Sequence, residues 1–184
     1  MNKTVLWITK TAMLVALLVV AQAATAALGN TLVTGSVVNM ILIISVMTCG
    51  WKSGVTVAAI SPICAKLFGI GPLWSILPFL MLGNTAIVLT WHFVGNRLIP
   101  FPLRIMQRKG VSYILALISG AVVKSAVLYL GIVQLAIPFL LDLPEKQAAT
   151  ISGMFSISQL ITAIIGGAIA AAILPLLTRA IRRG

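Results

Sequence analysis

The sequence predicts an all-α integral membrane protein, built as a bundle of six transmembrane helices. Two observations indicate this fold class. First, 60% of the 184 residues are hydrophobic and only 8% are charged, whereas soluble domains contain about 45–50% apolar and about 25% charged residues. Second, apolar runs near the ~20 residues that a helix needs to cross a bilayer follow one another with short polar breaks. A transmembrane β-barrel would instead show alternating segments of ~10 residues.

The six helices are expected in one domain over residues 1–184, at residues 5–28, 35–50, 54–70, 73–95, 111–137 and 148–178. The first apolar run is longer than the core of a secretion signal and five more runs follow it, so we expect a retained helix. The third and fourth helices contain Pro62 and Pro78, each of which removes an intrahelical hydrogen bond and frees a carbonyl group. The fifth helix carries Lys124 near its centre. The longest polar breaks are a cationic segment at 96–110 and a segment at 141–147 that holds both acidic residues.

The basic residues predict the orientation of the chain. With the N-terminus in the cytoplasm, the cytoplasmic segments hold ten of the thirteen basic residues, which are Lys3, Lys10, Lys52, Arg97, Arg104, Arg108, Lys109, Arg179, Arg182 and Arg183. This asymmetry follows the positive-inside rule, so we expect an N-in/C-in topology. The net charge of +11 then reflects topology and not nucleic-acid binding. The aromatic residues expected at the membrane interfaces are Trp7, Trp51, Trp74 and Trp91.

Polar side chains are concentrated in the outer half of the predicted bundle. Counting depth at about 1.5 Å per residue, this half receives Asn30, Thr31, Thr34, Ser36, Asn39, Lys66, Asn84, Lys124, Gln134, Ser152, Ser156 and Gln159. The inner half is nearly bare, with His92 as the main exception. Because buried polar groups need partners, a one-sided excess predicts a cavity that opens to the outside. The alternative is that each of these groups bonds a neighbouring helix.

Lys124 is the most informative of these residues. A lysine near the centre of a transmembrane helix costs roughly 2.5–3.5 kcal/mol, and no carboxylate lies within the predicted spans to neutralise it. Gly120 and Gly131 lie on the same helix face, which would give the ammonium a gap between helices. We expect a ligand that carries an anion or a strong acceptor, with Lys66 as a second positive group. The alternatives are that Lys124 snorkels to the outer surface or is covered by the acidic 141–147 segment.

The sequence contains no motif that would power transport or catalysis. A phosphate-binding loop is absent, since the similar GWKSG at 50–54 lacks the second glycine. Cys49 and Cys64 are placed toward opposite membrane surfaces, and no metal-ligand spacing, catalytic triad or carboxylate pair is present. We therefore expect no enzyme activity, cofactor or metal. An outward-facing pocket in a bundle without a proton-relay carboxylate implies that another polypeptide supplies the energy. An autonomous facilitator or channel for a small solute is the main alternative, and a membrane scaffold is a weaker one.

Three segments resemble the substrate-binding S components of energy-coupling factor (ECF) vitamin importers. The most specific is LVTGSVVNMILIISVMTCGWKSGVTVAAISPICAKLFGIGP at 32–72, followed by LPFLMLGN at 77–84. TAMLVA at 11–16 fits the Ala-x-x-x-Ala element in the first helix of that family. The resemblance covers the whole chain as a small, N-in protein of six helices, in the cell membrane of a prokaryote.

The resemblance implies a mechanism and a set of partners. An S component binds a vitamin-like micronutrient in an external pocket, docks through its first helix on a membrane coupling subunit that two cytoplasmic ATPases drive, and topples to deliver its cargo. By position, Ala12 and Ala16 would lie on the docking face, and the first external loop, with Asn30, Thr31 and Thr34, would form part of a lid. Depth and polarity, and no recognised ligand motif, assign the remaining site residues, which are Lys124, Asn84, Asn39, Lys66, Ser156 and Gln159.

Overall fold

The computed structural model describes residues 2–69, 73–95 and 109–183, and every regular element among them is helical. The elements are α1 (Lys3–Ala26), α2 (Thr31–Cys49), α3 (Trp51–Leu67), the 3-10 turn η1 (Trp74–Ile76), α4 (Leu77–Thr90), the π-helix η2 (Trp91–Gly95), α5 (Lys109–Leu128), the π-helix η4 (Tyr129–Ala136), α6 (Ile137–Phe139), α7 (Glu145–Met154) and α8 (Ile157–Arg183). The described residues thus form six helical columns, as the all-α prediction required. Arg97, Arg104 and Arg108 of the predicted inner loop lie outside the described residues.

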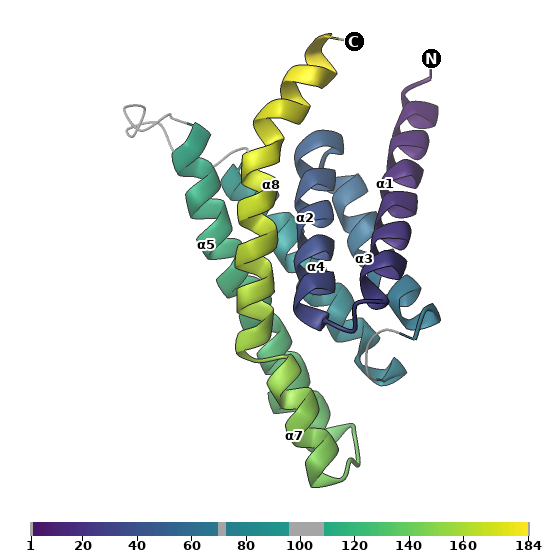
Figure 1. Ribbon diagram of the computed structural model, residues 1–184. Coiled ribbons are helices and arrows are strands. Elements are labelled where there is room, and N and C mark those ends of the chain that lie inside the picture. Colours follow the sequence, from purple (N-terminus) through teal and green to yellow (C-terminus); the bar gives the residue numbers. More distant parts are fainter. Residues whose placement is uncertain (1, 70–72, 96–108, 184) are drawn as a thin grey trace.

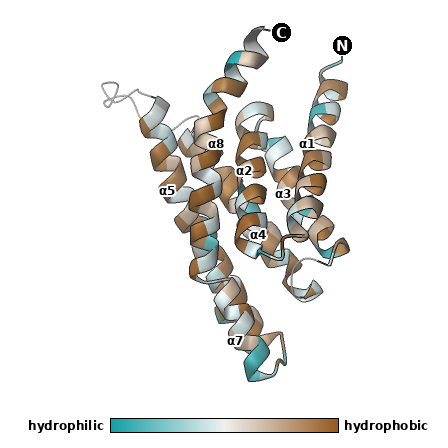
Figure 2. Ribbon diagram, viewed as in Figure 1, coloured by the Kyte–Doolittle hydropathy of each residue, from teal (hydrophilic) through white to brown (hydrophobic). Residues whose placement is uncertain are grey.

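Apolar residues cover most of the helices (Figure 2). Within the described residues, five helices are long and apolar enough to cross a membrane, which are Thr4–Ala26, Thr31–Cys49, Trp74–Gly95, Gly110–Phe139 and Glu145–Ala180. The sixth column, α3, has 17 residues, fewer than the ~20 of a typical crossing, and packs against α1, α2 and α4. Five columns therefore satisfy the length and composition of a span, and the sixth is a shorter helix inside the bundle.

Both termini lie at the same end of the bundle (Figure 1). Because successive columns alternate in direction, the start of α3 and the end of α8 share the end that holds the termini, while the end of α3 and the start of α7 lie at the opposite end. Two termini at the same end of the bundle are expected when the chain crosses the membrane an even number of times. Which end faces the cytoplasm stays a prediction from the distribution of basic residues.

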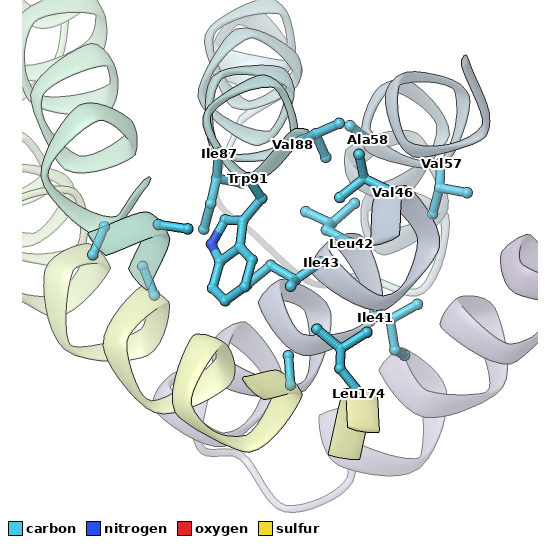
Figure 3. Close-up of a cluster of buried hydrophobic side chains, with 14 of the residues drawn as sticks. Ile41, Leu42, Ile43, Val46, Val57, Ala58, Ile87, Val88, Trp91 and Leu174 are labelled. Carbon is cyan, nitrogen blue, oxygen red and sulfur yellow. The ribbon is translucent and has the colours of Figure 1, made fainter. Parts of the chain in front are cut away.

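Trp91 lies at the centre of the main apolar core (Figure 3). Its side chain is fully buried among residues of α2, α4, α5 and α8. Glycines make room for it, since a Cβ added to Gly120 would lie 3.1 Å from the indole and one added to Gly167 would lie 3.5 Å from it. The prediction that Trp91 is an interfacial residue is therefore wrong, because the helix continues as η2 and the indole turns inward. Trp7, Trp51 and Trp74 are all more than one-third exposed.

The helix α4 packs closely against α5 and η4 through glycines. A Cβ on Gly83 would lie 2.6 Å from the Leu128 side chain, and one on Gly131 would lie 2.7 Å from the Phe79 ring. Side chains thus occupy the space beside Gly120 and Gly131, and the expectation that these glycines leave a gap for Lys124 is wrong. Pro78 also differs from expectation, because it lies in the first turn of α4, where a helix needs no N–H from it.

The predicted helix at 148–178 is two helices. The first, α7, ends at Met154, and α8 begins at Ile157 after a break at Phe155 and Ser156. Together with η4 and α6, α7 extends past the other columns at the end opposite the termini (Figure 1). A second apolar cluster holds this extension to α4, and its buried members are Ile76, Leu128, Ile132, Ile151 and Phe155. The break places Met154, Phe155 and Gln159 beside a cavity between the columns.

Candidate ligand-binding site

A cavity of about 150 Å³ lies in the half of the bundle away from the termini. Its polar lining residues are Gln22, Thr31, Thr34, Ser61, Lys66, Asn84, Lys124 and Gln159. Its other lining residues are Gly35, Val38, Pro62, Ala65, Leu73, Leu77, Leu80, Met154 and Phe155. The lining residues that the structure describes include two lysines and no acidic residue. An apolar void of about this volume accommodates one aromatic ring, which sets the scale of a bound molecule.

Lys124 enters the cavity wall from α5 and is held by two amides. Its Nζ donates to Oδ1 of Asn39 at 2.5 Å and to Oδ1 of Asn84 at 2.8 Å, and its side chain is only 3% exposed. The side chain therefore points into the bundle and does not snorkel outward. Asp142 and Glu145 are exposed and are not among the partners of Lys124. Two neutral oxygens replace part of the hydration of the ammonium but leave its charge uncompensated.

Asn39 reaches Lys124 because α2 and α8 approach each other closely. A Cβ added to Gly166 of α8 would overlap the carbonyl oxygen of Ser36 and lie 2.8 Å from the Cβ of Asn39. Because the two helices are this close, Asn39 Nδ2 of α2 donates to Thr162 Oγ1 of α8 at 3.3 Å. Thr162 Oγ1 in turn donates to the carbonyl oxygen of Gln159 at 3.1 Å. The chain of hydrogen bonds fixes the amide of Asn39 with its oxygen toward Lys124.

Gln22 forms the wall on the side of α1. Its Nε2 donates to the carbonyl oxygen of Ser61 at 3.2 Å and to the hydroxyl of Ser61 at 3.3 Å, which ties α1 to α3. Neither residue was predicted for the site from the sequence, although both line the cavity. The available signals were a glutamine in the otherwise small and apolar outer part of the first helix and a serine directly before Pro62.

Five of the residues predicted for the site line this cavity, which are Lys124, Asn84, Lys66, Gln159 and Thr34. The Nζ of Lys66 lies 6.0 Å from the ring centroid of Trp74, a cation–π distance. Gln159 Nε2 donates to the carbonyl of Met154 at 3.3 Å, and the Thr34 hydroxyl donates to the carbonyl of Asn30 at 3.4 Å.

Three of the predicted residues do not line the cavity. Asn39 is fully buried, and its Oδ1 accepts a hydrogen bond from Lys124, which lines the cavity. Ser156 donates to the carbonyl of Ser152 at 2.6 Å, so its hydroxyl is used within its own turn. Asn30 caps α2, with its Oδ1 accepting from the backbone N–H of Leu32 at 3.0 Å. Thr31, the other predicted lid residue, does line the cavity.

The inner half of the bundle holds more polar groups than expected, and several of them are hydrogen-bonded. Thr11 of α1 and Ser53 of α3 share a hydrogen bond of 2.8 Å, and both are buried. Ser45 of α2 is also buried and donates to the carbonyl of Leu42 at 2.7 Å. Unpartnered buried atoms occur in both halves, and among the described residues they are Gln22 Oε1, Trp91 Nε1, His92 Nδ1 and Ser125 Oγ.

A comparison with protein families identifies the chain at this point. Residues 7–178 match the family described as "ECF transporter, substrate-specific component". The chain belongs to this family. The resemblance noted in the sequence is thereby confirmed, and this S component is a membrane-embedded transporter subunit. Neither the curated proteins nor the solved structures gave a significant match.

The first helix of this S component presents its small residues outward. Ala12 and Ala16 are exposed, and α1 is the least buried of the candidate spans among the described residues. Ala12 and Ala16 line a shallow groove whose other walls are formed by Trp7, Ile8, Thr11, Val15, Thr56 and Ile60. Exposed small residues at a spacing of four let a second helix approach closely in lipid.

Proposed function

We propose that this S component captures a small anionic or acceptor-rich micronutrient from outside the cell of a prokaryote and delivers it to a separate energy-coupling module. The module comprises a membrane coupling subunit and two cytoplasmic ATPases. The observation that carries the proposal is the position of Lys124, a buried cation in a cavity wall with only neutral hydrogen-bond acceptors.

The charge of the cavity supports an anionic or acceptor-rich cargo. Lys124 and Lys66 contribute positive groups, and no Asp or Glu is among the described lining residues. An ammonium has three N–H donors, of which two are used by Asn39 and Asn84. A carboxylate or a similar acceptor is the natural partner for the third, because a charge-assisted hydrogen bond is about twice as strong as a neutral one.

The exposed alanines of α1 support docking through this helix. Because lipid and a partner helix are equally apolar, the hydrophobic effect does not drive helices together in a membrane. Small residues favour association because they let the two backbones pack closely. Ala12 and Ala16 provide this surface on a helix whose outward face has no partner in the described chain. We infer that the coupling subunit packs on the groove that these two alanines line.

Reconstitution into liposomes distinguishes this function from an autonomous facilitator. A solute extract of the growth medium is supplied outside the vesicles as the source of small molecules, and the content of the vesicle lumen is measured by mass spectrometry. The proposal predicts that the protein alone retains a bound small molecule at one per chain without ATP and moves nothing into the lumen. Accumulation of a solute in the lumen by the protein alone would instead establish a facilitator or channel.

A further inference from the structure

A groove runs along one face of α7 and adjoins the cavity. It has a volume of about 350 Å³, and its lining residues are Leu73, Lys146, Gln147, Thr150, Ile151 and Met154. All of these except Leu73 belong to α7, and they recur at the spacing of one helical turn. Leu73, directly before η1, forms the wall opposite this face of α7.

Leu73 and Met154 belong to both spaces. They line the groove, and they also line the cavity that holds Lys124. Both side chains are partly exposed, so each has surface that a small molecule can contact. The groove and the cavity therefore meet at these two side chains.

The groove leads from the far tip of the molecule toward the bundle. The helix α8 runs back to the end with the termini, so α7, which precedes it, begins at the far tip and ends beside the other columns (Figure 1). Lys146 lies in the first turn of α7 and Met154 is its last residue, about 12 Å further along the axis at 1.5 Å per residue. A molecule that follows the groove thus reaches the cavity from the end opposite the termini.

The walls along this course carry positive charge. Lys146 lies at the outer end of the groove, and Lys66 and Lys124 line the cavity. No acidic residue is among the described lining residues of either space. Asp142 and Glu145 are close to Lys146 in the chain, but neither lines the groove. Walls of one sign of charge raise the local concentration of the opposite charge and so speed its entry.

From these observations we propose that the groove between α7 and Leu73 is the entrance through which an anionic ligand reaches the cavity, with Lys146 as the first contact of its anionic group. The inference rests on the proposed binding function and adds a route and an outer contact site to it. The alternative entrance lies beside Thr31 at the start of α2, an exposed residue that lines the cavity but not the groove.

Labelling of a single cysteine in the cavity tests the entrance on the purified full chain. The native cysteines are replaced by Cys49→Ala and Cys64→Ala, and Val38→Cys places one thiol in a part of the cavity wall that the groove does not share. The probes are anionic 2-sulfonatoethyl methanethiosulfonate and cationic 2-(trimethylammonium)ethyl methanethiosulfonate. Labelling rates are followed by mass spectrometry and divided by the rates of the same reagents with 2-mercaptoethanol.

A bulky side chain in the groove should slow the labelling of Val38→Cys. Thr150 is exposed and lines the groove, so Thr150→Trp should lower the rate at least about tenfold, because an indole is large for this space. Ala149→Trp is the matched control, since Ala149 is exposed and does not line the groove, and its rate should stay within about twofold. If Thr150→Trp does not fold, Gln147→Trp places the same bulk in the same groove and should have the same effect.

Three results would overturn the entrance. The first is an equal rate with tryptophan in the groove and at Ala149. The second is slowing by Thr31→Trp but not by Thr150→Trp, which would place the entrance beside α2. The third is a Val38→Cys thiol that neither reagent labels in the folded protein, although both label it after unfolding.

The charge of the reagent separates this inference from the proposed function. The anionic reagent should label Val38→Cys at least about tenfold faster than the cationic one after normalisation. Lys146→Met should reduce this preference by at least about threefold, and Lys52→Met, at the start of α3, should leave it unchanged. If the anionic reagent is preferred and Lys146→Met has no effect, the anion site stands and the role of Lys146 is wrong. If the cationic reagent is preferred, the proposed anion site fails, and the tryptophan variants still decide whether the groove is the entrance.

Discussion

Lys124 Nζ on α5 lies 2.5 Å from Asn39 Oδ1 on α2, and both residues are buried within membrane-spanning helices. This contact links the two columns that enclose the cavity on one side. Asn39 supplies an oxygen to a charge that has no carboxylate partner, and Thr162 holds the Asn39 amide in the required orientation. The pair thus explains how a lysine at the middle of a helix is kept inside the bundle.

Asn39→Leu should destabilise the protein because it leaves Lys124 with one acceptor fewer. We expect a loss of about 1–3 kcal/mol in the free energy of unfolding, the usual cost of an unpaired buried group. Chemical unfolding in detergent, followed by tryptophan fluorescence, measures the effect. The double variant Lys124→Met with Asn39→Leu is the control, since it also removes the charge. Its loss should be smaller than the sum of the two single losses, and simple additivity would show that the contact has no energetic role.

Gly166→Ala should separate α2 from α8. The added Cβ would overlap the backbone oxygen of Ser36, which cannot move aside as a flexible side chain can. We expect a destabilisation of about 1–3 kcal/mol, as for overpacked cores, together with weaker retention of the bound molecule because Asn39 is displaced. Thermal unfolding and mass spectrometry measure the two effects.

Gly153→Ala is the matched control for that substitution. A Cβ at Gly153 in α7 would meet nothing within 4 Å, so the change should be neutral or stabilise α7 by up to about 1 kcal/mol through helix propensity. Equal losses for Gly153→Ala and Gly166→Ala would contradict the assigned close contact between α2 and α8.

Ala16→Trp should abolish delivery of the cargo while leaving its capture intact. Ala16 is exposed on α1, so a bulky side chain there would block a partner helix without entering the cavity. Uptake is measured in cells that contain the coupling module, and binding is measured on the purified subunit. Ala168→Trp, at an exposed alanine of α8, is the control and should transport normally. Loss of binding in Ala16→Trp would indicate that this face of α1 serves internal packing.

Much of the fold was accessible from the sequence because lipid imposes one dominant requirement. Each crossing needs a long apolar run, so composition predicted the positions of most columns. The break between α7 and α8 was not predictable in this way, because Phe155 and Ser156 interrupt the helix within an apolar and weakly polar stretch. The burial of Trp91 was also not predictable from its own segment, because it depends on the space beside Gly120 and Gly167 in two other columns.

The depth of each residue along its helix was predictable from the sequence, but the direction in which its side chain points around the helix axis was not. Lys124, Asn84 and Lys66 lie at the predicted level and also face the cavity. Ser156 lies at the same level but bonds its own turn, and Asn30 caps a helix. Rotation about each helix axis is set by packing contacts such as that of Gly166 with Ser36, which no single run of residues reveals.

Native mass spectrometry of gently extracted protein tests the central claim most directly. The wild type should carry one small molecule per chain that is anionic when released. Lys124→Met should retain it at least tenfold less, because a charge-assisted hydrogen bond contributes about 1.5–3 kcal/mol. Lys52→Met, at an exposed lysine near Trp51 at the start of α3, should retain it as the wild type does. A wild type without any bound molecule, or equal retention in Lys124→Met, would contradict the account.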